Sequence, residues 1–221
     1  MENNTQPRLV PEVGSAFSYG WKKMKENFAD LLVLTIILLV AQSLGSISGV
    51  NNSNEVSISD SSISFLLWLL ISGPVSFSVT WVFLKVVRGD PYEIKDSVSC
   101  FSSHYFEVML ANLLVTFIVV IGVIFLIIPG IIFGIKLAFV PYLVMDKKMK
   151  ATDALKASWE MTKGHGWNLF FMGFLSIFIV FAGLLLLIVG IFPAIMWINS
   201  SFASYYYAVD AATPEEPVIE G

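Results

Sequence analysis

The chain has little charge and a single cysteine. Only 14% of its 221 residues are Asp, Glu, Lys or Arg, which is about half of the share in soluble domains. Hydrophobic residues make up 56%, and a chain of this length cannot bury so much apolar surface in its own core. Cys100 has no second cysteine to pair with, so no internal disulfide forms. These shortages exclude an ordinary soluble protein and indicate a protein whose surface faces lipid.

The sequence patterns of common enzymes are missing as well. There is no H-E-x-x-H, G-x-S-x-G or P-loop pattern. Cys100 and His104 are four residues apart and could share a helix face, but a metal site needs three or four ligands, and His165 is the one other histidine or cysteine that the sequence adds. The basic residues are few and scattered, which argues against nucleic acid as a partner. We therefore expect no catalytic residue, no metal, no cofactor and no nucleic-acid partner.

Long apolar stretches indicate membrane spans, because a helix needs about 20 apolar residues to cross a bilayer. They cover residues 28–46, 64–87, 106–144 and 168–209. The last two are too long for one crossing, and prolines divide them at the predicted turns 128–130 and 190–193. We expect the first stretch to be a retained span, because a secretory signal would begin earlier. The pattern thus predicts six spans.

The positions of the basic residues predict the orientation. The following twelve of the thirteen lie before the first span, between spans two and three, or between spans four and five: Arg8, Lys22, Lys23, Lys25, Lys85, Arg88, Lys95, Lys147, Lys148, Lys150, Lys156 and Lys163. Cytoplasmic connections carry the excess of Lys and Arg. Both termini should therefore face the cytoplasm, and residues 212–221 should form a flexible acidic tail.

An internal repeat accompanies the even-numbered spans. Residues 73–90, 129–146 and 192–209 align without gaps, and each begins with an expected proline-containing turn. The alignment superimposes Phe83, Phe139 and Phe202, and it superimposes Asp90 and Asp146, with Asp210 one position later. The repeat predicts one membrane domain over residues 1–211, built from three units of approximately 14–90, 91–147 and 148–210.

A second shared element precedes the odd-numbered spans. Residues 16–31 align with 154–169, so that Trp21 matches Trp159 and Lys25 matches Lys163. Such helices, with apolar residues on one face, should lie along the membrane surface with Trp at the level of the lipid headgroups. The predicted fold is an all-α bundle of six transmembrane helices in three hairpins, each preceded by an amphipathic interfacial helix. The four named residues are the predicted interfacial anchors.

Lys136 is the one charge deep inside a predicted span, which makes it a candidate functional residue. Thr80 and Asn199 occupy the same position in the other two repeats, so the three side chains are predicted to form a polar layer near the membrane centre. A structural role is the alternative, in which Lys136 hydrogen-bonds locally and steadies the bundle. A stripe of small residues in the same span favours close helix packing; it consists of Gly130, Gly134 and Ala138.

Part of the chain resembles a bacterial family of six-span membrane proteins of unassigned function. The family includes the membrane region that precedes some glycerophosphodiester phosphodiesterase domains. The residues that carry the resemblance are Tyr19-Gly20-Trp21, Lys25, Pro129-Gly130, Lys136-Leu137-Ala138-Phe139, Pro141-Tyr142, Asp146, Ala154-Leu155, Ser158-Trp159 and Thr162-Lys163-Gly164. The resemblance implies a bacterial cytoplasmic membrane and a fold, and it implies no reaction.

Two functions are compatible with these features. The first is a non-enzymatic integral membrane protein that organises lipid or partner proteins at the cytoplasmic membrane. The second is a small transporter or channel that uses the polar layer around Lys136, since transporters are often built from repeats. Membrane lipids are the expected partners in both cases, and a protein partner or a second copy of the chain is also compatible.

Overall fold

The computed structural model describes residues 10–47, 58–99, 101, 104–185 and 190–213. All regular structure in these ranges is helical. The elements are α1 (Val13–Glu26), α2 (Phe28–Ile47), α3 (Ile58–Arg88), the 3₁₀-helix η1 (Ile94–Val98), α5 (Tyr105–Phe125), α6 (Ile127–Lys136), α7 (Val140–Asp146), α8 (Ala151–Met161), α9 (Gly166–Leu185) and α10 (Ile191–Ala212). The all-α prediction is confirmed, and nearly all of the predicted acidic tail lies outside the described residues.

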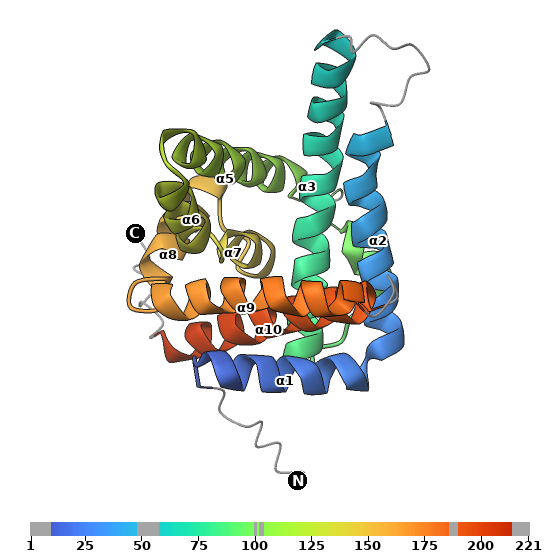
Figure 1. The fold of residues 1–221 in the computed structure, drawn as a ribbon, viewed down its shortest axis with the longest axis vertical. Coiled ribbons are helices and arrows are strands. Elements are labelled where there is room, and N and C mark those ends of the chain that lie inside the picture. Colours follow the sequence, from blue (N-terminus) through green and yellow to red (C-terminus); the bar gives the residue numbers. More distant parts are fainter. Residues whose placement is uncertain (1–9, 48–57, 100, 102–103, 186–189, 214–221) are drawn as a thin grey trace.

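The helices form two groups that cross each other (Figure 1). Helices α2 and α3 lie side by side as an upright pair. Helices α9 and α10 pack together across the lower part of that pair, and α1 runs along α10. Helices α5, α6, α7 and α8 pack on the other side of α3. The core lies where α10, α3 and α7 meet.

Four helical segments are long and apolar enough to cross a membrane. They are Leu70–Arg88, Tyr105–Phe125, Ile127–Asp146 and Gly166–Leu185. Helix α2 contributes a shorter apolar segment, Phe28–Ser43. These helices indicate a membrane protein, as the composition predicts.

Helix α10 is covered by its neighbours over much of its length, and it is not one of the four segments. Its sequence carries hydroxyl and amide side chains, including Asn199, Ser200, Ser201 and Ser204. All three serines are buried, and Ser201 and Ser204 donate hydrogen bonds to carbonyls of their own helix. Because α1, α3 and α9 cover the helix, the serines are removed from the surface of the protein and Asn199 is half-buried.

The turn predicted at residues 128–130 lies earlier in the chain, at Leu126. Helix α5 ends at Phe125, Leu126 alone is extended, and α6 already includes Pro129 as its third residue. The first four N–H groups of a helix have no partner within it, so a proline there costs no hydrogen bond. The same rule places Pro193 third in α10, which begins one residue after Gly190.

The expected turn at Gly73-Pro74 is wrong, because both residues lie inside α3. Proline has no N–H, so the carbonyl of Leu70, four residues earlier, loses its helical partner. The hydroxyl of Tyr105, on α5, donates a hydrogen bond to that carbonyl at 3.1 Å. A Cβ on Gly73 would lie 2.1 Å from the side chain of Asn112. The contact with α5 therefore compensates for the proline and needs the glycine.

The predicted surface helices are present as helices in two of the three places. They are α1 and α8. The third place, around Asp96 to Met109, begins in the 3₁₀-helix η1, and its residues 100, 102 and 103 lie outside the described residues. Helix α1 packs closely on α10, where a Cβ on Gly20 would lie 2.6 Å from the hydroxyl oxygen of Ser201. The indole N–H of Trp197 donates to the carbonyl of Phe17 at 2.9 Å. One side of α1 is thus fixed to the core, and its other side is exposed.

Candidate functional site

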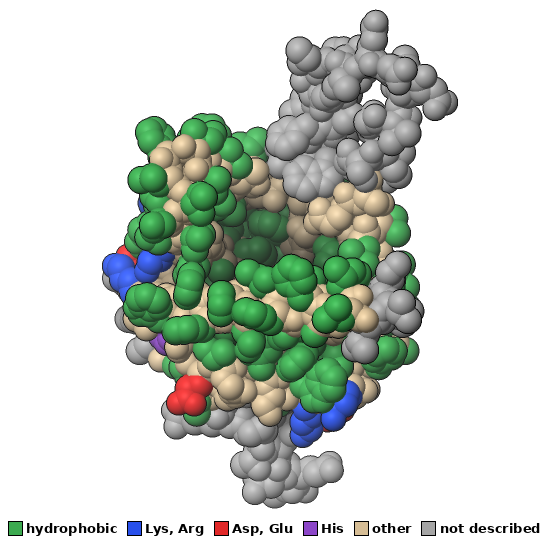
Figure 2. Space-filling model, in the orientation of Figure 1, with side chains coloured by type: hydrophobic (Ala, Val, Ile, Leu, Met, Phe, Trp, Pro, Cys, Tyr) green, Lys and Arg blue, Asp and Glu red, His purple; other side chains and the backbone are tan. Residues whose placement is uncertain are grey.

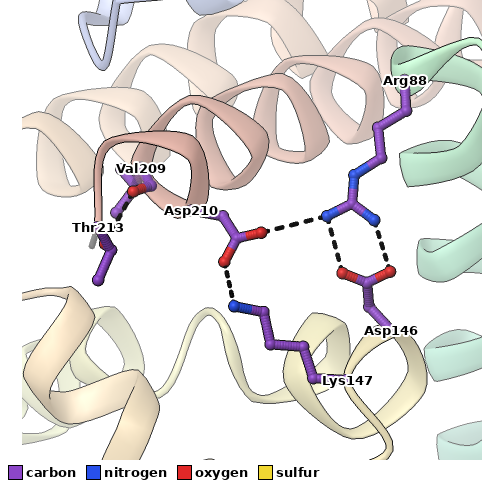
Figure 3. A network of polar contacts seen from close by, with 6 residues as sticks. All are labelled: Arg88, Asp146, Lys147, Val209, Asp210 and Thr213. Atoms are coloured by element: carbon purple, nitrogen blue, oxygen red, sulfur yellow. Dashed lines mark hydrogen bonds and ion pairs between the residues drawn. The ribbon is translucent and has the colours of Figure 1, made fainter. Parts of the chain in front are cut away.

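The ends of α3, α7 and α10 meet in a network of ion pairs (Figure 3). Arg88 lies in the last turn of α3, and it donates hydrogen bonds from Nη1 and Nη2 to the two carboxylate oxygens of Asp146, at 2.5 and 2.8 Å. Its Nη2 also lies 3.4 Å from Oδ2 of Asp210, on α10. Lys147 pairs with the other oxygen of Asp210. We call these four residues the ion-pair junction.

The ion-pair junction is balanced in charge and mostly withdrawn from solvent. Two cations face two carboxylates, and the side chains of Arg88, Asp146 and Asp210 are 18%, 15% and 17% exposed. At such low exposure a charge needs its partner, because an unpaired buried charge is costly. Beneath the junction, the rings of Tyr142 and Tyr206 stack with centroids 4.6 Å apart. The arrangement joins three helices and offers no nucleophile or proton-transfer pair.

Sequence reasoning noted the aspartates but did not predict the junction. The chain advances by the same 17 residues from Pro129 to Asp146 and from Pro193 to Asp210. Both prolines are third in their helices. An alignment anchored on the prolines would have superimposed the two aspartates, and that spacing was the available signal. Arg88 had no such signal, because the sequence identified it only as one of the basic residues that predict the orientation.

Lys136 is the last residue of α6, at a break in the predicted fourth span. The chain leaves the helix over residues 137–139, and α7 begins at Val140. The hydroxyl of Ser158, on α8, donates to the carbonyl of Lys136 at 2.8 Å and accepts from the N–H of Phe139 at 3.2 Å. One buried serine therefore satisfies both sides of the break, and it fixes α8 against it.

The ammonium group of Lys136 lies 5.6 Å from the ring centroid of Trp159. Asn199, a second member of the predicted polar layer, donates to the carbonyl of Ile195 on its own helix. Thr80, the third member, is half-buried on α3. Among the described residues, no hydrogen bond, ion pair or ring contact joins these three side chains. The structure does not bring the layer together by direct contact, and its common depth stays a prediction.

Of the predicted anchors, Trp21 and Lys25 lie on the exposed side of α1, Trp159 lies on that of α8, and Lys163 lies in the turn after α8. Trp21 is 40% and Trp159 is 37% exposed. The ring of Trp21 packs on Trp197, with centroids 4.8 Å apart, and the ammonium of Lys25 lies 5.7 Å from the Trp21 centroid. Lys163 forms an exposed ion pair with a neighbouring glutamate on α8. Their position relative to a membrane stays a prediction.

The three small residues of the predicted stripe do not share one helix. Gly130 is buried, and a Cβ there would lie 2.3 Å from Cγ2 of Val123. Gly134 has open space where its Cβ would be. Ala138 comes after α6 has ended. Close approach therefore depends on Gly130, which lets α6 fold back on α5.

A second polar cluster ties η1 and its loop to α2 and α3. The hydroxyl of Tyr92 donates to Oδ2 of Asp30 at 2.6 Å. Burial, and then the hydrogen bond to Asp30 and its charge, raise the pKa of Tyr92 to about 12. Lys85 pairs with Asp96 at 2.9 Å. Burial opposes ionisation of Asp96, but its bonds to Lys85 and to the backbone N–H of Glu93 outweigh burial and lower its pKa.

No family model, curated protein or solved structure matches the chain. The relation to the membrane region before some glycerophosphodiester phosphodiesterase domains therefore stays an expectation that rests on the quoted residues. In the ranges that the structure describes, no group of three or more His, Cys, Asp or Glu side chains is placed to hold a metal ion.

Proposed function

We propose that the chain is a non-enzymatic integral membrane protein that organises lipid or partner proteins at a bacterial cytoplasmic membrane. It crosses the bilayer six times, as three helical hairpins, with both termini in the cytoplasm. The observation that carries the proposal is the exposed apolar surface of α5 and α9: only 17% of the spanning segment of each helix is buried inside the protein.

The apolar surface extends along the whole length of both helices. Exposed members are Phe117, Val120, Ile124 and Phe125 on α5 and Phe171, Phe174, Ile177, Phe178 and Phe181 on α9. Figure 2 shows apolar side chains over these helices and around a hollow between them. Soluble monomers rarely expose continuous apolar patches of more than a few hundred Å². Lipid is the solvent in which such a surface is stable.

The ion-pair junction supports the proposed orientation. Arg88, Asp146 and Asp210 stand at the ends of the second, fourth and sixth proposed spans, and they contact one another. These three ends therefore belong on one side of the membrane. The excess of basic residues on that side supports a cytoplasmic location for it.

Helices α2 and α10 supply the two spans beyond the four apolar segments. The apolar part of α2 is short, and the polar groups of α10 are covered by its neighbours. Polar residues within a span are tolerated where they face protein. The matched spacing of Pro129 to Asp146 and Pro193 to Asp210 supports the repeat in the last two hairpins. The first hairpin departs from it, since Pro74 lies within α3.

No observation favours the transporter or channel. That function needs a polar path, whereas Lys136 contacts Trp159 at the edge of α8. The hollow in Figure 2 is lined by apolar side chains, which suit lipid chains better than a polar substrate.

The topology can be tested by labelling single cysteines with a membrane-impermeant maleimide in intact cells, in a Cys100→Ala background. Cysteines at Asn54, Ile128 and Val189 should be labelled from outside. Cysteines at Lys148 and Thr213 should be labelled only after permeabilisation. Labelling of Lys148 in intact cells would contradict the orientation. Labelling of Val189 and Thr213 from the same side would show that α10 does not cross.

A further inference from the structure

Lys136 stands at the boundary between two kinds of surface. On its own helix, the preceding exposed side chains are Ile131 and Ile132, at 45% and 47% exposure. On the adjoining helix α8, the exposed side chains include Lys156 and Glu160. Figure 2 shows basic side chains at the edge of the apolar surface, in the region where α6 and α8 lie. An amphipathic ligand would meet its two preferred environments here.

The charge of Lys136 has no acidic partner within the described residues. Its recorded neighbour is the indole of Trp159, which attracts a cation but carries no charge of its own. Among the lysines without a described acidic partner, Lys136 alone belongs to one of the four apolar segments. A cation in apolar surroundings needs a counter-charge.

The neighbourhood of Lys136 is held in place. Ser158 bonds both sides of the chain break and so fixes the position of α8 beside it. The next residue, Trp159, also packs near Phe133 of α6, with ring centroids 6.1 Å apart. Lysine and indole are therefore presented together by two helices, with the indole 37% exposed.

We propose that Lys136 and Trp159 bind the headgroup phosphate of an anionic phospholipid, whose acyl chains lie on the exposed apolar side of α6 and the α5–α6 turn. The ammonium group pairs with the phosphate oxygens. Trp159 occupies the headgroup level that tryptophan prefers. This inference rests on the proposed membrane function and names a lipid site for it.

The test uses the purified full chain in a mild detergent. The midpoint of thermal unfolding is measured with added phosphatidylglycerol, phosphatidylcholine or inorganic phosphate, and native mass spectrometry counts the retained lipids. Phosphatidylglycerol should raise the midpoint most, and inorganic phosphate should not raise it. Lys136→Met should lose at least half of that gain and bind the lipid at least tenfold more weakly. Lys136→Arg should keep it.

Two further variants keep the test decisive. Lys95→Met removes an equal charge from an exposed ion pair in η1, so it should respond like the wild type. Trp159→Leu keeps the lysine and should also weaken the response to phosphatidylglycerol. It therefore provides the test if Lys136→Met does not fold. An unchanged response in Lys136→Met or in Trp159→Leu would overturn the site while leaving the membrane function intact, because the wild type would still bind lipid. Equal stabilisation by inorganic phosphate would assign the site to a soluble anion instead.

Discussion

Arg88 binds Asp146 through two parallel hydrogen bonds that join helix ends 58 residues apart in the sequence. The same guanidinium reaches Asp210, a further helix end 122 residues away from it. A guanidinium presents its donors in a rigid planar fork, which suits one carboxylate bidentately and leaves a donor for a second. One side chain therefore joins the ends of three helices that are far apart in the sequence.

Replacing Arg88 by Met should destabilise the protein, because Asp146 would remain largely buried without its partner. Breaking such a pair costs about 3 kcal/mol, so the thermal midpoint in detergent should fall clearly. The thermal midpoint of Arg88→Lys should lie between those of the wild type and Arg88→Met, since an ammonium group cannot form two parallel hydrogen bonds to one carboxylate as a guanidinium does. Lys95→Met, in an exposed pair, is the matched control and should leave the midpoint unchanged. An equal midpoint for Arg88→Met and the wild type would refute a structural role for the junction.

The helical class was predictable because apolar residues recur in long runs with few charges. The burial of α10 was not predictable from the sequence. Helix α10 carries serines and tyrosines that lower its hydropathy, yet its neighbours cover them. Burial of this kind depends on the tertiary arrangement, and a linear pattern cannot show which helix the others will surround. The pairing of Arg88 with Asp146 and Asp210 was not predictable for the same reason, although the equal spacing of the two aspartates from their prolines could have linked them.

The depth predicted for Lys136 assumed one straight helix from Pro129 to Asp146. The structure interrupts that helix after Lys136 and resumes it at Val140. Pro141, the second residue of α7, lacks the N–H that would bond the carbonyl of Leu137, and the side chain that satisfies the break, Ser158, comes from α8. A helix rise of about 1.5 Å per residue therefore does not apply across this segment.

Ionisation of Tyr92 should occur at unusually high pH. Its folded pKa is raised from 10.0 to about 12 by burial and by Asp30. The stability that this phenol contributes is therefore complete below pH 10 and is lost as the pH rises toward 12. The tyrosinate absorbance of the wild type minus that of Tyr92→Phe should titrate with a midpoint near 12.

Asp30→Asn provides the matching test of the cause. It removes the negative charge that opposes ionisation of Tyr92 but leaves a hydrogen-bond acceptor in place. The midpoint of the difference titration should then move down from about 12 toward 10. An unchanged midpoint would show that burial alone raises the pKa and that the contact at 2.6 Å with Asp30 has no electrostatic effect.

The two glycines of α6 should respond oppositely to alanine, although both were predicted as packing residues. At Gly130 a new Cβ would lie 2.3 Å from Cγ2 and 2.8 Å from the backbone nitrogen of Val123. Since backbone cannot yield as a flexible side chain does, Gly130→Ala should cost about 1–3 kcal/mol. At Gly134 the same Cβ meets nothing within 4 Å. Gly134→Ala should therefore be neutral or stabilise the helix by up to about 1 kcal/mol.

Thermal midpoints of both variants, measured in the same detergent, separate close packing from helix propensity. Propensity alone would make both alanines stabilising, because each replaces a helical glycine. A packed stripe along the whole span would make both destabilising. Only a close approach confined to the α5–α6 turn gives opposite signs, since Gly130 touches the preceding helix and Gly134 faces open space.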